Sequence, residues 1–148
     1  MKMIYRILDF LKHPFLLLIR LYWGYAFFQA GFGKFNNMPH VIDFFTQLGI
    51  FMPKYNAYFV ATVETVGGLF LMAGLFSRLI AIPLVINMIV ALLTAHAAAT
   101  LNLLHDPKTF FEQEPFLFLY ASLIVTLFGP GAFSIDDLRY RLKERVSK

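Results

Sequence analysis

The chain has 148 residues, of which 59% are hydrophobic and only 15% are charged. Because an ordinary soluble domain carries roughly 25% charged residues, this composition excludes a typical soluble enzyme and fits one small membrane domain. The absence of cysteine excludes disulfides, thiolate metal ligands and a Cys-x-x-Cys redox pair, and the net charge of +4 is concentrated near the chain ends, so we expect no nucleic-acid partner.

The first predicted element is a basic amphipathic lead-in, residues 1–14. It carries Lys2, Arg6 and Lys12 among apolar residues at helical spacing, which favours a helix at the membrane surface. Residues 15–33 follow as a long apolar run. This run is too long for the core of a signal peptide and no small-residue cleavage motif follows it, so we predict an uncleaved membrane span.

Three more spans are predicted further along the chain, at residues 57–76, 79–99 and 115–128. The Ser77-Arg78 link between the first two of these is so short that they must form an antiparallel hairpin. Residues 35–56 are expected to be a loop that lies in the membrane interface or folds back onto the bundle. Residues 100–114 are expected to be a polar loop.

The chain is predicted to end in a solvated basic helix. A Gly-Pro-Gly run after the last span breaks the helix, and Ser134 is a candidate N-cap for a helix with Asp136 and Asp137 in its first turn. The predicted organisation is all-α: an integral membrane four-helix bundle over residues 15–133, preceded by the lead-in and followed by a tail at residues 134–148.

The distribution of basic residues predicts the orientation in the membrane. Most Lys and Arg lie in the lead-in, in the link between the second and third spans, and in the tail, whereas the other two loops hold Lys34, Lys54 and Lys108. The positive-inside rule then places both termini in the cytoplasm, in agreement with an even number of spans. We expect a multi-pass protein of the plasma (inner) membrane, in contact with the lipid bilayer.

Ionisable side chains inside the predicted spans are the main functional candidates. A charge in hydrocarbon costs about 2.5 to 3.5 kcal/mol on insertion scales, so it normally faces the bundle interior and has a partner or a function. Glu64 lies about 10 Å below the outer boundary of its span at about 1.5 Å per residue. We expect it to pair with Lys34 or with Arg20, which lies deeper. Three further side chains are predicted to reach the outer level of Glu64: Gln29, His96 and Glu114.

Several of these positions also have a structural explanation. Lys34, Arg78 and Glu114 are of the kind that snorkel or cap at a membrane interface. His96 stands among alanines, where a hydrogen-bonded structural histidine is common, and its spacing from His40 and His105 matches no strong metal motif. We therefore assign no metal site. Glycines and alanines that recur along the spans are interpreted as helix-packing positions.

A set of motifs stands in a fixed order over about residues 15–138. They are Arg20-Leu21, Gly24, Gly31, Lys34, Glu64, Gly67-Gly68-Leu69, Gly74, Arg78, Met88, Ala91, His96, Glu114, Gly129-Pro130-Gly131, Ser134 and Asp136. This ordered set resembles the DoxX family of small four-helix membrane proteins. The resemblance implies association with a membrane oxidoreductase assembly, such as a terminal quinol oxidase or a thiosulfate:quinone oxidoreductase. It also implies functional positions at Arg20, Lys34, Glu64, Arg78, His96 and Glu114.

Three functions remain open. The first is a subunit or accessory of a quinone-linked membrane oxidoreductase, with Glu64 and His96 as catalytic proton groups and quinone as the implied cofactor. Substrate-binding positions would then be Arg20, Gln29, Lys34, Arg78 and Glu114. The second is a non-catalytic scaffold or assembly subunit, because the sequence has no cofactor motif of its own; its partners would be oxidoreductase subunits or further copies of the chain. The third is a small-molecule transporter, because intramembrane charges also mark permeation paths.

Overall fold

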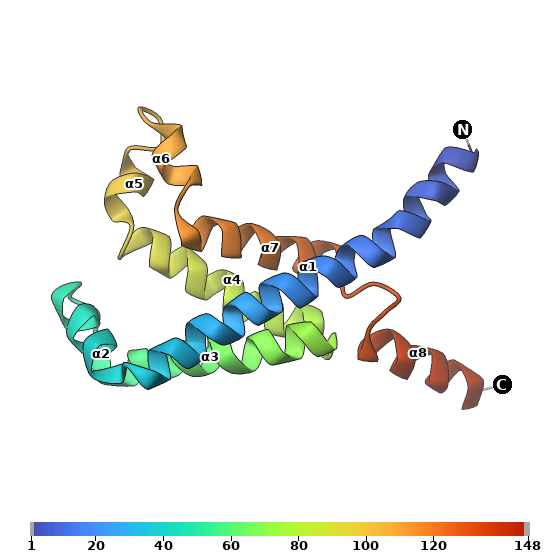
Figure 1. The fold of residues 1–148 in the computed structure, drawn as a ribbon, viewed down its shortest axis with the longest axis horizontal. Coiled ribbons are helices and arrows are strands. Elements are labelled where there is room, and N and C mark those ends of the chain that lie inside the picture. The colour runs from blue at the N-terminus through green and yellow to red at the C-terminus, as the bar shows by residue number, and fades with distance from the viewer. Residues whose placement is uncertain (1, 147–148) are drawn as a thin grey trace.

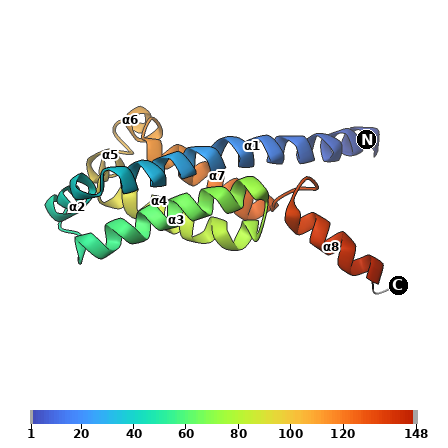
Figure 2. The same ribbon diagram turned by 60° about the horizontal axis from the view of Figure 1, so that its bottom comes forward.

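The computed structural model describes residues 2–146, with the side chains of residue 3 and of residues 10–145. Every element in this range is a helix, which confirms the all-α prediction. The four longest apolar helices pack side by side (Figures 1 and 2): α1 (Lys2–Asn36), α3 (Pro53–Ala73), α4 (Ser77–Leu93) and α7 (Glu114–Phe128). The remaining helices are α2 (Met38–Gln47), α5 (Ala97–Leu101), α6 (Pro107–Phe111) and α8 (Ile135–Val146).

Among residues 2–146, two segments are long and apolar enough to cross a membrane: Phe10–Asn36 within α1, and all of α3. The helices α4 and α7 are also apolar but have only 17 and 15 residues. The predicted lead-in and the first predicted span belong to one uninterrupted helix, α1, which accommodates Pro14 in its interior.

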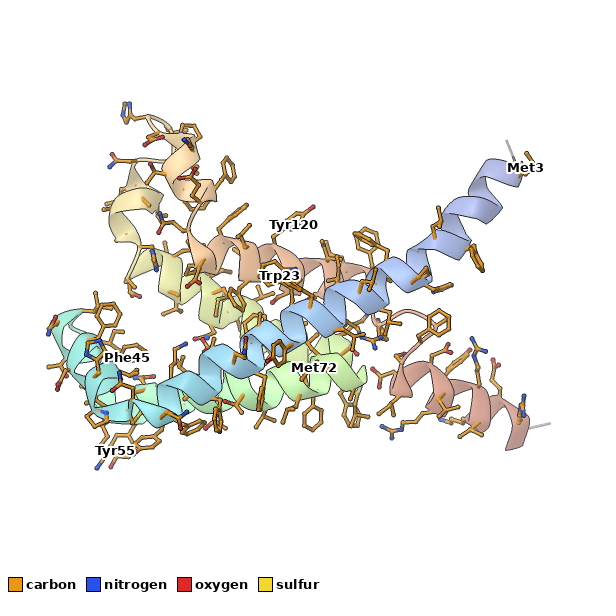
Figure 3. The ribbon with its side chains drawn as sticks, viewed as in Figure 1. Met3, Trp23, Phe45, Tyr55, Met72 and Tyr120 are labelled. Atoms are coloured by element: carbon orange, nitrogen blue, oxygen red, sulfur yellow. The ribbon has the colours of Figure 1, made fainter. Side chains whose placement is uncertain are left out.

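The two ends of the molecule differ. Both chain termini lie at one end of the packed helices, which we call the terminal end, and α2, α5 and α6 lie at the opposite end, the loop end (Figures 1 and 2). The largest buried cluster lies between the four long helices and contains Phe27, Leu71, Ala81, Leu84, Met88 and Val125. Outward-facing side chains such as Leu18, Phe59 and Tyr120 are 60–66% exposed, and Figure 3 shows Tyr120 pointing away from the helices. An outer surface of this kind is typical of contact with lipid.

Glycines set the close approach of α1 and α3. A Cβ atom on Gly68 would lie 2.5 Å from the carbonyl oxygen of Gly24 and 2.5 Å from the backbone nitrogen of Phe28. A Cβ atom on Gly31 would lie 2.5 Å from the backbone nitrogen of Thr65. The two backbones therefore touch where side chains are absent, which confirms the packing interpretation of these glycines.

The turn between α3 and α4 comes earlier than the sequence indicated. It covers Gly74 and Phe76, both with left-handed backbone at φ 67° and 49°, so α3 ends before the predicted limit at residue 76 and α4 already begins at Ser77. The Asp136 carboxylate stabilises this start because it accepts hydrogen bonds from the backbone N–H of Phe76 (2.8 Å) and of Ser77 (2.9 Å). A residue from the predicted tail thus caps a helix that lies 59 residues away in sequence.

The segments predicted as loops contain helices. Residues 35–56 include α2, whose buried Met38 packs on Ala57 and Ala61 of α3, so this segment does fold back onto the long helices. Residues 100–114 include α6. The third span was expected to reach residue 99, but α4 ends at Leu93, and threonine hydroxyls bond backbone carbonyls at its end: Thr94 Oγ1 donates to Val90 and Thr100 Oγ1 to Leu92, each at 2.7 Å.

The start of α8 agrees with the prediction. Ser134 Oγ accepts a hydrogen bond from the backbone N–H of Asp137 at 3.1 Å, and Asp136 and Asp137 lie in the first turn. Serine at this position therefore acts as the expected N-cap.

Candidate functional site

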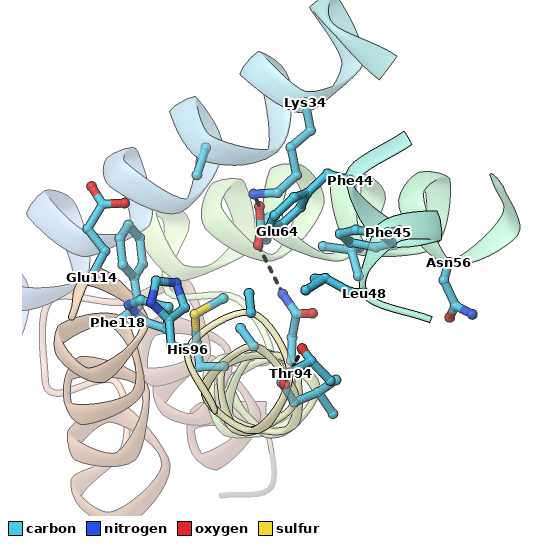
Figure 4. Close-up of a pocket in the computed structure, with 18 of the residues that line it drawn as sticks. Lys34, Phe44, Phe45, Leu48, Asn56, Glu64, Thr94, His96, Glu114 and Phe118 are labelled. Carbon is cyan, nitrogen blue, oxygen red and sulfur yellow. Dashed lines mark hydrogen bonds and ion pairs between the residues drawn. The ribbon is translucent and has the colours of Figure 1, made fainter. Parts of the chain in front are cut away.

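A cavity of about 260 Å³ lies at the loop end, between α1, α3, α4 and α7 and beside α2 (Figure 4). Most of its wall is apolar. Its aromatic lining residues are Phe27, Phe44, Phe45 and Phe118, of which the middle two belong to α2. Its polar lining residues are Lys34, Asn56, Glu64, Asn87, Thr94, His96 and Glu114.

Glu64 is the centre of a polar cluster in this cavity. The residue is 3% exposed, and its Oε2 lies 2.5 Å from the Nζ of Lys34 while its Oε1 accepts a hydrogen bond from Asn87 Nδ2 at 3.0 Å. The three side chains come from three helices, α3, α1 and α4, and Figure 4 shows Lys34 and Glu64 pointing toward each other. Of the two partners expected for Glu64, Lys34 is the one that contacts it in the structure. The charges of Lys34 and Glu64 offset each other, which is the condition under which a buried carboxylate is tolerated.

His96 forms a second polar contact of the cavity. Its Nδ1 lies 2.6 Å from Oε1 of Gln113, whose Nε2 in turn donates to the carbonyl of Thr109 at 2.7 Å. Because the amide nitrogen of Gln113 is used as a donor, its oxygen faces His96 and must accept, so Nδ1 carries the proton. In the neutral imidazole Nε2 then keeps its lone pair and can accept a hydrogen bond or a proton.

The segment that holds Gln113 is itself ordered by a capped turn. Asp106 is the N-cap of α6 and accepts hydrogen bonds from both the backbone and the hydroxyl of Thr109. These bonds hold the pKa of the Asp106 carboxyl below its ordinary value, with the Thr109 side chain making the largest contribution. Glu114, the first residue of α7, is exposed and lines the cavity beside this segment.

Arg20 belongs to a different part of the molecule, so its predicted pairing with Glu64 is wrong. Its guanidinium is buried at the terminal end, where Nε donates to the carbonyl of Leu71 (3.1 Å) and Nη2 to that of Phe133 (2.9 Å). It also donates to the carbonyls of Pro130 and Met72. Arg20 lies at the middle of α1 and contacts the C-terminal end of α3, whereas Lys34 lies near the C-terminus of α1, at the loop end.

Two other predicted binding residues also lie outside the cavity lining. Arg78 is at the start of α4, at the terminal end, and is exposed; its Nη2 lies 3.4 Å from the carbonyl oxygen of Leu127. Gln29 is exposed and donates to the hydroxyl of Tyr25 at 2.9 Å. At about 100° per residue, Gln29 points away from the side of α1 that carries Phe27 and Lys34 into the cavity.

The structure therefore brings together four of the predicted site residues: Lys34, Glu64, His96 and Glu114. It adds two that sequence reasoning missed, Asn87 and Gln113. Asn87 was detectable as the amide within the otherwise apolar interior of α4, and Gln113 as the polar residue next to Glu114.

Within the described residues the protein is all-helical, with two helices long and apolar enough to cross a membrane and a polar cluster in a mostly apolar cavity. The sequence model of the DoxX family matches residues 15–97, and the chain belongs to that family. The chain is also 28% identical, over 128 residues, to a protein of Bacillus subtilis (strain 168) named "Putative oxidoreductase CatD"; the match covers 86% of this chain and 89% of that protein. The comparison with solved structures found no significant match.

Proposed function

We propose that the protein is a subunit or accessory of a quinone-linked membrane oxidoreductase and that its loop-end cavity binds the ring of a quinone or quinol. The observation that carries this proposal is the combination, in one mostly apolar cavity, of the Lys34–Glu64–Asn87 cluster with a histidine held by Gln113. The oxidoreductase named among the similar proteins supports the class of activity.

The dimensions of the cavity favour a ring. Ligand pockets usually measure about 300 to 1,000 Å³, so a cavity of about 260 Å³ suits a flat head group whose isoprenoid tail stays among the helices or in lipid. Phe27, Phe45 and Phe118 supply apolar contact for such a ring. The ammonium of Lys34 and the imidazole of His96 supply hydrogen bonds to its oxygen atoms.

The polar residues of the cavity would accept and release the protons of the reaction. A bound quinol supplies two electrons and two protons when it is oxidised. His96 would accept a proton at Nε2 while Gln113 keeps Nδ1 protonated, and Glu64 would accept the other proton while Asn87 keeps its carboxyl group in place. Lys34 offsets the negative charge of Glu64 between turnovers. Glu114, exposed at the cavity wall, is positioned to pass protons to water. The electrons would pass to a cofactor in a partner subunit.

We also propose that α1, α3, α4 and α7 all cross the plasma membrane, with the terminal end in the cytoplasm. The concentration of Lys and Arg near the chain termini supports this orientation. Because the chain has no cysteine, single cysteines report topology cleanly. In intact cells an impermeant maleimide should label Leu104→Cys at the loop end and should label Arg145→Cys only after permeabilisation. The reverse pattern would contradict the orientation.

The test of function is to purify the protein gently from its native membranes, identify bound quinone, and measure quinol oxidation. Glu64→Gln and His96→Asn should each lower turnover by at least tenfold, as expected for loss of a general acid–base group. Gln29→Ala, which changes a polar residue outside the cavity lining, is the matched control and should keep turnover. A preparation without quinone, together with unchanged turnover in Glu64→Gln, would remove the proposal.

A scaffold role is the second candidate, and the Lys34–Glu64 pair is the observation that favours it. Glu64 has a partner on both carboxylate oxygens, as in a structural tie that joins α1, α3 and α4. A scaffold should cross-link to a partner in native membranes, and its assembly should tolerate His96→Asn. Isolation of the protein without any stable partner would contradict this role.

A further inference from the structure

The helix α8 begins at the level where the long helices end. The candidate span in α3 ends at Ala73, and the carbonyl of the next residue, Gly74, accepts a hydrogen bond from the backbone N–H of Asp136 at 3.0 Å. The Asp136 carboxylate in turn caps the start of α4 at Phe76 and Ser77. The first turn of α8 is therefore fixed at the boundary of an apolar segment, which in a membrane is the depth of the lipid head groups.

From this attachment α8 projects away from the long helices at the terminal end (Figures 1 and 2). Its apolar residues Ile135, Leu138 and Leu142 have the spacing i, i+3, i+7, so they form one stripe along the helix. The last two are 56% and 53% exposed. The stripe is thus open in the part of the chain that the structure describes, although three large aliphatic side chains in a row are costly to leave in water.

Basic side chains border this stripe on both edges. At about 100° per residue, Arg139 and Lys143 fall along one edge, and Arg141 and Arg145 fall along the other. All four are exposed. The acids of α8 do not interrupt the stripe, because Asp136 caps α4 and the other two lie on the opposite face: Asp137, which pairs with Arg141 at 2.7 Å, and Glu144.

We propose that α8 is an interfacial helix that binds a membrane surface rich in anionic lipids. Leu138 and Leu142 insert between the head groups, and the two basic edges bind lipid phosphates, with their long side chains reaching outward from the apolar stripe. Basic edges beside an apolar stripe complement a negatively charged leaflet. The attachment at Gly74 brings α8 to the depth at which these lipids lie.

The test uses the full chain, with a single spin label on α8, in nanodiscs of either phosphatidylcholine alone or equal parts phosphatidylcholine and phosphatidylglycerol. One label is at Leu142→Cys on the stripe and the other at Tyr140→Cys, about 160° away around the helix. With phosphatidylglycerol present, the label at 142 should become at least about twofold less accessible to an aqueous nickel chelate and more accessible to oxygen. The label at 140 should stay accessible to the chelate. High salt should weaken the effect at 142, because the attraction is electrostatic.

Two double variants that remove the same number of charges distinguish the effect of the basic residues of α8 from the effect of the net charge of the chain. Lys143→Gln/Arg145→Gln should remove at least about half of the phosphatidylglycerol effect at position 142. Lys54→Gln/Lys108→Gln, which removes two exposed charges at the loop end, should leave the effect unchanged. Three results would overturn the proposal: equal chelate accessibility at 142 and 140 in both lipids, protection at 142 that is independent of phosphatidylglycerol, or spin–spin broadening that shows the stripe to be covered by a second copy of the chain.

Discussion

The ion pair between Lys34 and Glu64 can be tested by Lys34→Met, which removes the charge and keeps an apolar side chain of similar length. Glu64 would then remain buried at 3% exposure with only the Asn87 amide as a partner. Loss of one partner of a buried pair costs roughly 3 to 5 kcal/mol. Because the Lys34 side chain is 28% exposed, water already reaches the pair, and we expect about 2 to 3 kcal/mol.

The double variant Lys34→Met/Glu64→Gln completes a thermodynamic cycle. It replaces the charged pair by a neutral side chain that Asn87 can still contact, so its cost should be smaller than the sum of the single variants by about 1 to 2 kcal/mol. Unfolding in mixed micelles can be followed by the fluorescence of Trp23, the single tryptophan, whose ring packs edge-on against Phe118 with centroids 5.1 Å apart.

A matched control for this cycle is Lys108→Met. Lys108 and Glu112 form an exposed pair at 3.7 Å, with side chains 82% and 65% exposed, so the change should cost no more than about 0.5 kcal/mol. If Lys34→Met is as mild as this control, or if the two cavity variants are strictly additive, the side chains of Lys34 and Glu64 do not meet and the description of the cavity is wrong.

Three further predictions concern helix packing, the terminal end and the capped turn. Gly68→Ala should destabilise the protein by about 2 kcal/mol, because the new Cβ would clash with the α1 backbone. Gly33→Ala, which has open space at its Cβ, should be neutral or stabilising by up to about 1 kcal/mol. Equal effects of the two variants on unfolding in detergent would contradict the contact between α1 and α3. Arg20→Ala should cost about 3 kcal/mol because it removes a buried side chain together with its hydrogen bonds to the carbonyls of Leu71 and Phe133, and an unchanged melting temperature would show that these bonds are absent. Because the pKa of Asp106 is lowered, its cap stabilises the fold at pH values above the ordinary aspartate pKa, and this stabilisation is lost as the pH falls through the lowered value. The amide resonance of Thr109 should therefore shift with a pKa below the ordinary aspartate range. In Asp106→Asn the same resonance should not show this titration.

The sequence predicted the helical class and the main polar contact for physical reasons. Apolar runs and the cost of buried charge identify Glu64 as a residue that needs a partner, and counting the rise per residue places it about 10 Å below the outer boundary of its span, in the half of the bundle where Lys34 marks the end of the first span. Both deductions depend only on how far a residue lies along its helix, and this distance can be counted from a single sequence.

The errors concern side-chain direction and partner choice. Gln29 has the right depth but the wrong helix face. Arg20 donates to carbonyls at the end of α3 and in the segment between α7 and α8, which no charge pattern reveals. Asn87 was missed because the burial argument was applied to charged side chains, whose burial costs more than that of a neutral amide. The helix α2 was missed because it has only 10 residues. Its signals are Pro39 in the first turn and the apolar residues Val41, Ile42 and Phe45, and so short a segment shows little helical periodicity.

The most direct test of the proposed function is photoaffinity labelling of the purified protein with an azidoquinone, followed by mapping of the modified residues. We predict labelling on the cavity wall, in residues 44–50 and in the segments around His96 and Phe118, with protection by excess unmodified quinol and loss of labelling in a Glu64→Gln/His96→Asn double variant. Labelling confined to the lipid-facing residues of α1 and α7, unaffected by quinol or by the double variant, would contradict a quinone site in this cavity.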